Sequence, residues 1–357
     1  MRSPLKVKTT IPPNLTALRN TEKRHRVNLR RAATSGFMFT MACALFSFVS
    51  FASGQTKKIG MLPKFTSDPY FVAVNQGAQE AAKELNVTVE FNGPVDANVA
   101  AQANIIDQWV RAGMDAITVS ANDANALAPA LERAARRGIK VSTFDADVKA
   151  EARRVFLNQC TFDGMGKAMV EMMAKEAGSE GDFLIVTAVL TAPNQNRWIE
   201  EAKKYAAEKY PKMRFATVLP GDEDLEKSKN VALNYLRANP NTKGVLCVTG
   251  IATPGVAEAV KQLGLQGKVV VTGLGVPSLV RPYIKDGTIK EVALWNPVDI
   301  GYGAIYIAKS QLDGTLNPQS GFVDAGRLGK LKFVEKDVVL LGDPLIINGS
   351  NVDDFKF

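Results

Sequence analysis

An aspartate beside an aromatic ring, at the end of an apolar segment, is the pattern in this chain best suited to binding a ligand. Residues 139–144 read as a buried strand that leads directly into Asp145 and Asp147. In open α/β sheets, ligands bind just beyond the carboxyl ends of the strands. The carboxylate of Asp145 would accept hydrogen bonds from hydroxyl groups, and the ring of Phe144 would cover an apolar C–H face. This pattern predicts a polyhydroxylated ligand, although an Asx-turn or a helix N-cap is the alternative role for Asp145.

Similar side chains follow other predicted strands. The loop 192–198 holds amides, a guanidinium and an indole after the strand 183–188, and amides suit hydroxyl ligands because they both donate and accept. A polar helix start with Trp198 in the core is the alternative. Each of these polar and aromatic residues is common by itself, but all of them lie at the carboxyl ends of predicted strands. The predicted ligand-binding residues are Lys64, Tyr70, Phe71, Phe144, Asp145, Asn194, Gln195, Trp198, Thr249, Trp295 and Asn296.

Apolar strands and amphipathic helices alternate along the chain after residue 56, which predicts an α/β fold with βαβ crossovers and parallel sheets. Residues 113–144 and 243–273 each read as strand, helix and strand with similar spacing, which indicates two copies of one unit. Two such units form two lobes that face each other across a cleft, the usual place for a ligand. The predicted strands are 58–63, 87–91, 115–120, 139–144, 183–188, 215–219, 244–249 and 268–274, and the predicted helices are 69–85, 98–112, 125–137, 196–209, 225–238 and 254–263.

The C-terminal part adds more elements than the second lobe needs. We predict a strand at 290–295, a helix at about 300–312, and short strands and turns after residue 321. We therefore expect the tail to re-enter the first lobe, so that several segments cross between the lobes and form a hinge of defined path. The predicted boundaries are 56–158 plus 292–322 for the N-terminal lobe and 159–291 plus 323–345 for the C-terminal lobe.

The formal net charge of +8 does not indicate a nucleic-acid partner. Nine of the 44 basic side chains, but only one of the 36 acidic ones, lie within residues 1–54, which leaves 35 of each sign in the rest of the chain. A balanced surface offers no electrostatic attraction for a polyanion.

Residues 1–54 have the pattern of a bacterial secretory signal peptide. A basic segment precedes an uncharged apolar run at 37–52, and small residues follow it. That run of 16 residues is shorter than the roughly 20 that span a bilayer, although an uncleaved anchor is the alternative. We therefore predict export to the periplasm.

The side chains that remain after residue 54 exclude several kinds of catalysis. His25 is the only histidine and lies in the predicted signal, so zinc clusters and histidine-based triads are not available to the rest of the chain. Glycoside hydrolysis needs only carboxylates, but Asp145 and Asp147 are two residues apart on one segment, which is poor geometry for that reaction. Gly273 and Gly275 begin a dinucleotide motif that lacks its third glycine. We predict no enzymatic activity, no cofactor and no metal; a disulfide between Cys160 and Cys247 stays open.

The chain after residue 56 resembles the periplasmic substrate-binding proteins of bacterial sugar ABC importers, of the ribose-binding-like type. It is most similar to their rhamnose- and autoinducer-2-binding subgroup, and the resemblance extends over essentially residues 56–357. The segments that carry it are 59–64 (IGMLPK), 75–79 (NQGAQ), 144–147 (FDAD), 158–159 (NQ), 194–198 (NQNRW), 280–283 (VRPY), 287–291 (GTIKE) and 294–295 (LW).

The resemblance implies two Rossmann-like lobes, joined by three crossing segments, that close on a sugar. Autoinducer-2 binders share the lysine at Lys64, the aspartate at Asp145 and the glutamine at Gln195. They carry aspartates where this chain has Asn194 and Asn296, and a proline where Thr249 aligns.

Losing a charged partner from a buried ligand contact costs roughly 1.5–3 kcal/mol. We therefore expect a neutral sugar, rhamnose-like or a pentose, with an autoinducer-2 receptor as the alternative. The implied partners are the permease and ATPase subunits of an importer, and the protein is expected to be a monomer. A sensor role would use the same closed lobes.

Overall fold

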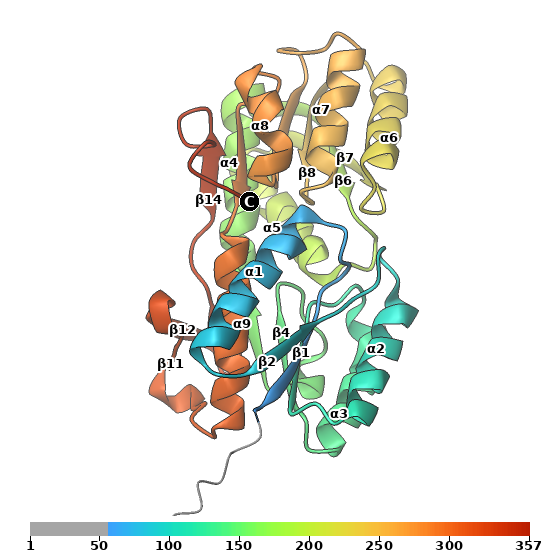
Figure 1. Ribbon diagram of the computed structural model, residues 1–357. Coiled ribbons are helices and arrows are strands. Elements are labelled where there is room, and N and C mark those ends of the chain that lie inside the picture. The colour runs from blue at the N-terminus through green and yellow to red at the C-terminus, as the bar shows by residue number, and fades with distance from the viewer. Residues whose placement is uncertain (1–55) are drawn as a thin grey trace, which may run out of the picture. The chain divides into compact units, whose positions relative to one another are not determined.

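The computed structural model describes residues 56–357 (Figure 1). The predicted signal peptide at 1–54 lies outside the described residues. Among residues 56–357, no helix combines the length and the apolar character needed to cross a membrane.

The first lobe is built on an eight-stranded sheet, mostly parallel, with the strand order β11-β12-β13-β5-β4-β3-β1-β2. Its parallel part pairs β1 with β2 and β3, β3 with β4, and β4 with β5. The strands are β1 (Lys58–Leu62), β2 (Thr88–Phe91), β3 (Ala116–Val119), β4 (Lys140–Phe144), β5 (Val155–Asn158), β11 (Phe322–Asp324), β12 (Lys330–Glu335) and β13 (Val338–Leu340). The helices are α1 (Pro69–Glu84), α2 (Val99–Ala112), α3 (Ala124–Arg136) and α9 (Pro297–Leu312).

The second lobe is built on a four-stranded parallel sheet with the order β7-β6-β8-β9 and a two-stranded antiparallel sheet of β10 and β14. The strands are β6 (Glu180–Thr187), β7 (Lys212–Pro220), β8 (Thr242–Cys247), β9 (Val270–Gly273), β10 (Glu291–Leu294) and β14 (Leu345–Asn348). The helices are α4 (Phe162–Ala177), α5 (Pro193–Lys209), α6 (Leu225–Ala238), α7 (Ala252–Gln262) and α8 (Pro277–Lys285). These sheets confirm the predicted α/β class with two lobes of parallel strands.

Three segments connect the lobes, at residues 159–161, 295–296 and 341–344. Two predicted boundaries need correction. The segment 292–322 was assigned to the first lobe, but β10 at its start belongs to the second lobe. The segment 323–345 was assigned to the second lobe. In the structure, β12 pairs with β13, and β13 pairs in parallel with β5 of the first sheet. Only β14 returns to the second lobe, where it pairs with β10. The physical reason is the free edge of β5, whose main-chain groups need a partner.

Helices α1 and α9 pack unusually closely against each other. A Cβ atom on Gly77 would stand 1.8 Å from the carbonyl oxygen of Val298, and one on Gly301 would stand 1.9 Å from that of Val74. Only glycine allows main chains to approach this closely. Tyr70 lies in the first turn of α1, and Trp295 lies just before α9. Tyr70 and Trp295, two predicted site residues, lie beside each other with their ring centroids 5.8 Å apart.

Candidate functional site

The carboxyl ends of both parallel sheets border one cavity of about 40 Å³. That volume is about the room that three water molecules need, at roughly 10–15 Å³ each. Its lining residues are Lys64, Asp68, Tyr70, Phe71, Asp145, Asn194, Gln195, Trp198, Glu223, Val248, Thr249, Gly250, Leu274, Val276, Leu294 and Trp295.

Asp145 follows β4 in a left-handed backbone conformation, with φ at 61°. Non-glycine residues adopt this region uncommonly, and aspartate is among those that tolerate it best. The turn directs a buried carboxylate toward the cavity, where it accepts hydrogen bonds from side chains of both lobes. These donors are the hydroxyls of Ser120 and Tyr70, the latter at 3.3 Å, and the amides of Gln159 at 3.3 Å and Asn194 at 3.5 Å. Burial raises the pKa of Asp145, while the positive charge of Lys64 and the hydrogen bonds from Ser120 and Tyr70 oppose the rise.

Two amides at the start of α5 provide the second lobe's polar contacts. Asn194 Oδ1 accepts a hydrogen bond from Lys64 Nζ at 3.0 Å, and this bond crosses between the lobes. Gln195 Oε1 accepts from the Thr187 hydroxyl at 2.7 Å and from the Ala188 main-chain N–H at 2.8 Å. The oxygen of Gln195 is therefore fixed, and its amide nitrogen is directed toward the cleft.

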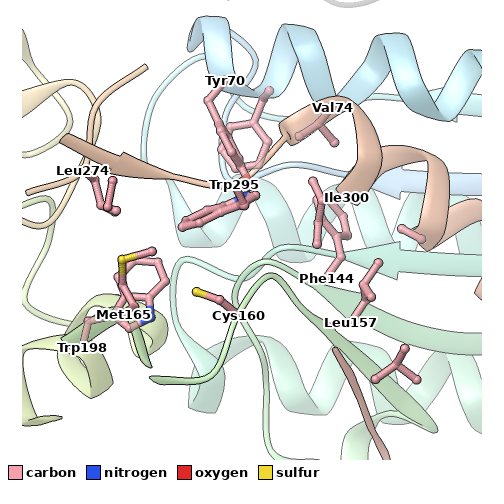
Figure 2. Close-up of a cluster of buried hydrophobic side chains, with 14 of the residues drawn as sticks. Tyr70, Val74, Phe144, Leu157, Cys160, Met165, Trp198, Leu274, Trp295 and Ile300 are labelled. Carbon is pink, nitrogen blue, oxygen red and sulfur yellow. Dashed lines mark hydrogen bonds between the residues drawn. The ribbon is translucent and has the colours of Figure 1, made fainter. Parts of the chain in front are cut away.

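Aromatic rings cover the cavity from both lobes. Figure 2 shows Trp295 between Tyr70 and Trp198, with ring centroids 5.8 and 5.6 Å away. The Trp295 indole N–H donates to the Tyr70 hydroxyl at 2.8 Å. The buried Trp198 indole N–H has no hydrogen-bond partner among the described residues, so it is a free donor beside the cavity. These rings supply apolar faces and a polar edge, as a sugar requires.

All the residues predicted for the site line the cavity except Phe144 and Asn296. Phe144 is fully buried in the hydrophobic core, near Leu157 and Ile300 (Figure 2). Its ring lies on the opposite side of the strand end from the cavity, because side chains alternate along a strand. Asn296 caps α9, with its side-chain oxygen accepting from the main-chain N–H of Val298 at 3.0 Å. This N-cap role accounts for an asparagine at position 296 without any contact to a ligand.

With this geometry in view, comparison with known proteins identifies the family. The family model for the periplasmic binding protein domain matches residues 59–316. The chain belongs to this family.

Individual relatives of this periplasmic binding protein agree with its fold. The D-allose-binding periplasmic protein of Escherichia coli is 25% identical over 279 residues, 74% of this chain and 86% of the relative. A solute-binding protein of Clostridium phytofermentas, solved with L-rhamnose, is 29% identical with a TM-score of 0.78, covering 84% of this chain and 98% of the other. LsrB from Clostridium saccharobutylicum, solved with AI-2, is 26% identical with a TM-score of 0.80, covering 84% and 100%. The neighbours share the two-lobed fold.

Two acidic residues of the binding protein's cavity were missed by the sequence reasoning, Asp68 and Glu223. Asp68 is the N-cap of α1, and Glu223 lies in the loop after β7 with φ at 54°. Both residues lie in loops that follow the carboxyl ends of strands, and this position could have predicted them as site residues from the sequence. Burial and, next, the negative charge of Glu223 raise the pKa of Asp68 to about 7. Burial likewise raises the pKa of Glu223, against the effects of Lys64, Thr249 and Gln195.

Both cysteines of the described chain are free thiols. Cys160 and Cys247 are buried and unpaired, which resolves the alternative that the sequence left open. Burial raises the pKa of Cys247 to about 12 and that of Cys160 further. Neither thiol is a reactive nucleophile at neutral pH, because only the thiolate reacts.

Proposed function

We propose that this protein binds a monosaccharide between its two lobes, as the substrate-binding component of an ABC-type sugar importer. The observation that carries the proposal is the buried carboxylate of Asp145, which faces a cavity lined by Asn194, Gln195 and four aromatic side chains. Carboxylate and amide groups fix hydroxyls, and rings cover the C–H faces of a sugar. Periplasmic location and delivery to permease and ATPase subunits follow as part of the same proposal.

The favoured sugar class is a rhamnose-like deoxyhexose or a pentose. A structural neighbour was solved with L-rhamnose, which supports this class. An autoinducer-2 receptor is the alternative, supported by the neighbour solved with AI-2. The asparagine at 194 weighs against the alternative, because the subgroup that binds autoinducer-2 carries an aspartate there. The asparagine at 296 weighs less, since its side chain caps α9.

Ligand entry requires the lobes to separate. A cavity of about 40 Å³ is far smaller than typical ligand pockets of about 300–1,000 Å³. A sugar that contacts both lobes stabilises the closed arrangement, so binding shifts the population toward it. This differential contact is what a transporter or a sensor would detect.

The proposal is one of binding rather than catalysis. Asp147 is the carboxylate nearest to Asp145 in sequence, and it forms an ion pair with Arg153 at 2.6 Å. It does not line the cavity, whereas Asp68 and Glu223 do. The case for binding therefore rests on the family match over residues 59–316. An assay of nitrophenyl glycoside hydrolysis would detect turnover if this interpretation were wrong.

Thermal melting against a ligand panel tests the proposal. The panel contains rhamnose, fucose, ribose, xylose, galactose, erythritol and autoinducer-2. A ligand at a thousandfold excess over its Kd stabilises the protein by roughly 4 kcal/mol and raises the Tm by several degrees. A shift with a single sugar supports the importer and names its ligand. A shift with autoinducer-2 alone supports the alternative, and no shift with any compound of the sugar class argues against the proposal.

A further inference from the structure

The charges that line the cleft do not balance. Three carboxyl side chains, Asp68, Asp145 and Glu223, line the cavity together with a single basic side chain, Lys64. The sequence favoured a neutral sugar because Asn194 and Asn296 stand where related binders carry acids. The structure brings two other acids to the same cavity. The sequence-based expectation therefore rested on an incomplete set of charges.

The three carboxyl groups also differ in how many hydrogen bonds they accept. Asp145 accepts hydrogen bonds from four side chains, and Glu223 accepts from the Thr249 hydroxyl and from the Gln195 amide at 3.3 Å. Asp68 is 8% exposed, and within residues 56–357 its carboxyl group accepts only from the main-chain N–H of Tyr70, at 2.9 Å. It therefore retains unused acceptor capacity at the wall of the cavity.

Lys64 does not neutralise these groups directly. Its Nζ atom donates to the neutral amide oxygen of Asn194 at 3.0 Å. Even if its charge offset one carboxylate fully, two would remain. Buried carboxylates persist only when they are paired or take up protons.

The aromatic lining suits a cation as well. The rings of Tyr70, Phe71, Trp198 and Trp295 border the cavity that the acids line. An ammonium group over an aromatic face is stabilised by about 0.5–2 kcal/mol of interaction free energy. The larger values apply where the site is shielded from water. Carboxylates combined with several rings favour a positively charged nitrogen over a hydroxyl at the same place.

We propose that the ligand of this cleft is a sugar or polyol of the deoxyhexose or pentose size that carries a protonated amine. Its ammonium lies toward Asp68 and Glu223, and its hydroxyls contact Asp145, Asn194 and Gln195. This inference rests on the proposed function and changes only the chemistry of the ligand.

Binding of such a ligand releases protons. Without a cation, part of the Asp68 population is protonated near pH 7, since burial and the charge of Glu223 raise its pKa to about 7. Burial also raises the pKa of Glu223. The charged groups that act on Asp68 are Glu223, Asp145 and Lys64. An arriving ammonium stabilises the carboxylate form and displaces the protons. A sugar with a hydroxyl in place of the amine has no such effect.

Calorimetric titration of the full protein at pH 7 with matched ligand sets tests the inference. Each set contains an amino sugar, the parent sugar with a hydroxyl at the same carbon, and the N-acetyl derivative, which has no charge. The sets are the 2-amino and 6-amino derivatives of glucose and galactose and the amino derivatives of rhamnose and ribose. We expect at least one amine to bind tenfold or more tightly than its parent and its N-acetyl derivative. Titration in two buffers of different ionisation enthalpy should show net proton release for that amine.

Two variants and a control locate the effect. Asp68→Asn and Glu223→Gln should each reduce the ratio of amine to parent affinity by about tenfold. Asp163→Asn, at an exposed position of α4, should leave that ratio unchanged. If a variant fails to fold, the proton-release measurement on the unaltered protein still decides.

The outcomes separate this inference from the proposed function. Parent sugars that bind as tightly as their amines, without proton release, overturn the inference and leave the sugar-binding function standing. Absence of binding by every amine and every parent sugar overturns both.

Discussion

Lys64 of the first lobe and Asn194 of the second are joined across the cleft, with Lys64 Nζ 3.0 Å from Asn194 Oδ1. The two residues are 130 positions apart in the chain, and both are buried. Asn194 in turn donates to Asp145, so the bond connects the cationic and anionic groups of the site. The closed arrangement therefore depends on a contact between the same residues that we expect to hold the ligand.

Replacing Lys64 with methionine should weaken closure. The Lys64→Met variant removes the hydrogen bond between the lobes and the only positive side chain of the cavity lining. We expect ligand affinity to fall about tenfold to a hundredfold, since a hydrogen bond to a charged group contributes roughly 1.5–3 kcal/mol. Small-angle X-ray scattering should show a larger mean radius of gyration. The exposed Lys203→Met serves as the control, and equal behaviour of the two variants would contradict the prediction.

Asp145→Asn should lower sugar affinity by about tenfold to a hundredfold. Asparagine tolerates the left-handed backbone of this position, so the change removes charge and acceptor strength while preserving the turn. Calorimetric titration with the ligand found in the panel measures the loss. Asp163→Asn, on the exposed side of α4, controls for a general change in charge. Unchanged affinity in Asp145→Asn would mean that the site is assigned wrongly.

Tyr70→Phe should destabilise the fold by about 1–3 kcal/mol. The Tyr70 hydroxyl accepts from the Trp295 indole at 2.8 Å and donates to Asp145 at 3.3 Å, so its removal leaves two buried groups with one partner fewer. Urea denaturation measures the free energy of unfolding. Tyr205→Phe, whose hydroxyl contacts Glu171 at a more exposed position, should cost less. The reverse order of the two variants would contradict the role given to Tyr70.

Gly77→Ala should be among the most damaging single substitutions in the protein. The added methyl group would stand 1.8 Å from the carbonyl oxygen of Val298, so α1 and α9 must separate. We expect a loss of several kcal/mol, as for other overpacked cores, or failure to fold. Gly342→Ala meets no atom within 4 Å and is the matched control. Thermal melting of both variants should show a large decrease in Tm for Gly77→Ala alone.

Titration of the Asp68 carboxyl group should make the free energy of unfolding decrease as the pH rises. Its pKa is raised from 3.8 to about 7, so between these values the folded state binds more protons than the unfolded state. Stability therefore falls as the pH rises through this window, and the loss is complete above about pH 7. Asp68→Asn keeps an N-cap for α1 and removes the titration. Melting curves from pH 4 to 8 should decline less steeply in this variant, and an identical slope would contradict the prediction.

The strand and helix pattern of this chain could be predicted because each element carries its own periodicity. The predicted helix 225–238 coincides with α6, and most other elements agree within a few residues. Short, polar or unpaired segments were harder: β5 and α8 were not predicted, and β6 and β7 are longer than expected. These strand ends are partly exposed, so hydrophobic burial does not mark them.

Local sequence also determined much of the site, because in parallel sheets the carboxyl ends of the strands lie at one edge. Lys64, Asp145, Asn194, Gln195 and Thr249 could be found for that reason. Local sequence did not determine whether a side chain at a strand end points into the cavity or into the core. Phe144, next to Asp145, is fully buried in the core and does not line the cavity, because successive side chains of a strand point to opposite faces.

The tertiary structure alone decided which residues share the cavity and which strands share a sheet. Asp68 and Glu223 read as helix-start and loop residues, and only the approach of the two lobes brings their charges together. Likewise β13 joins β5, and β14 joins β10, because those strands offered free edges. Hydrophobic periodicity is a property of neighbouring residues, whereas charge balance and strand pairing depend on groups that are distant in sequence. For that reason the sequence determined the fold class and the type of ligand site, and the charge of that site became visible only in the folded chain.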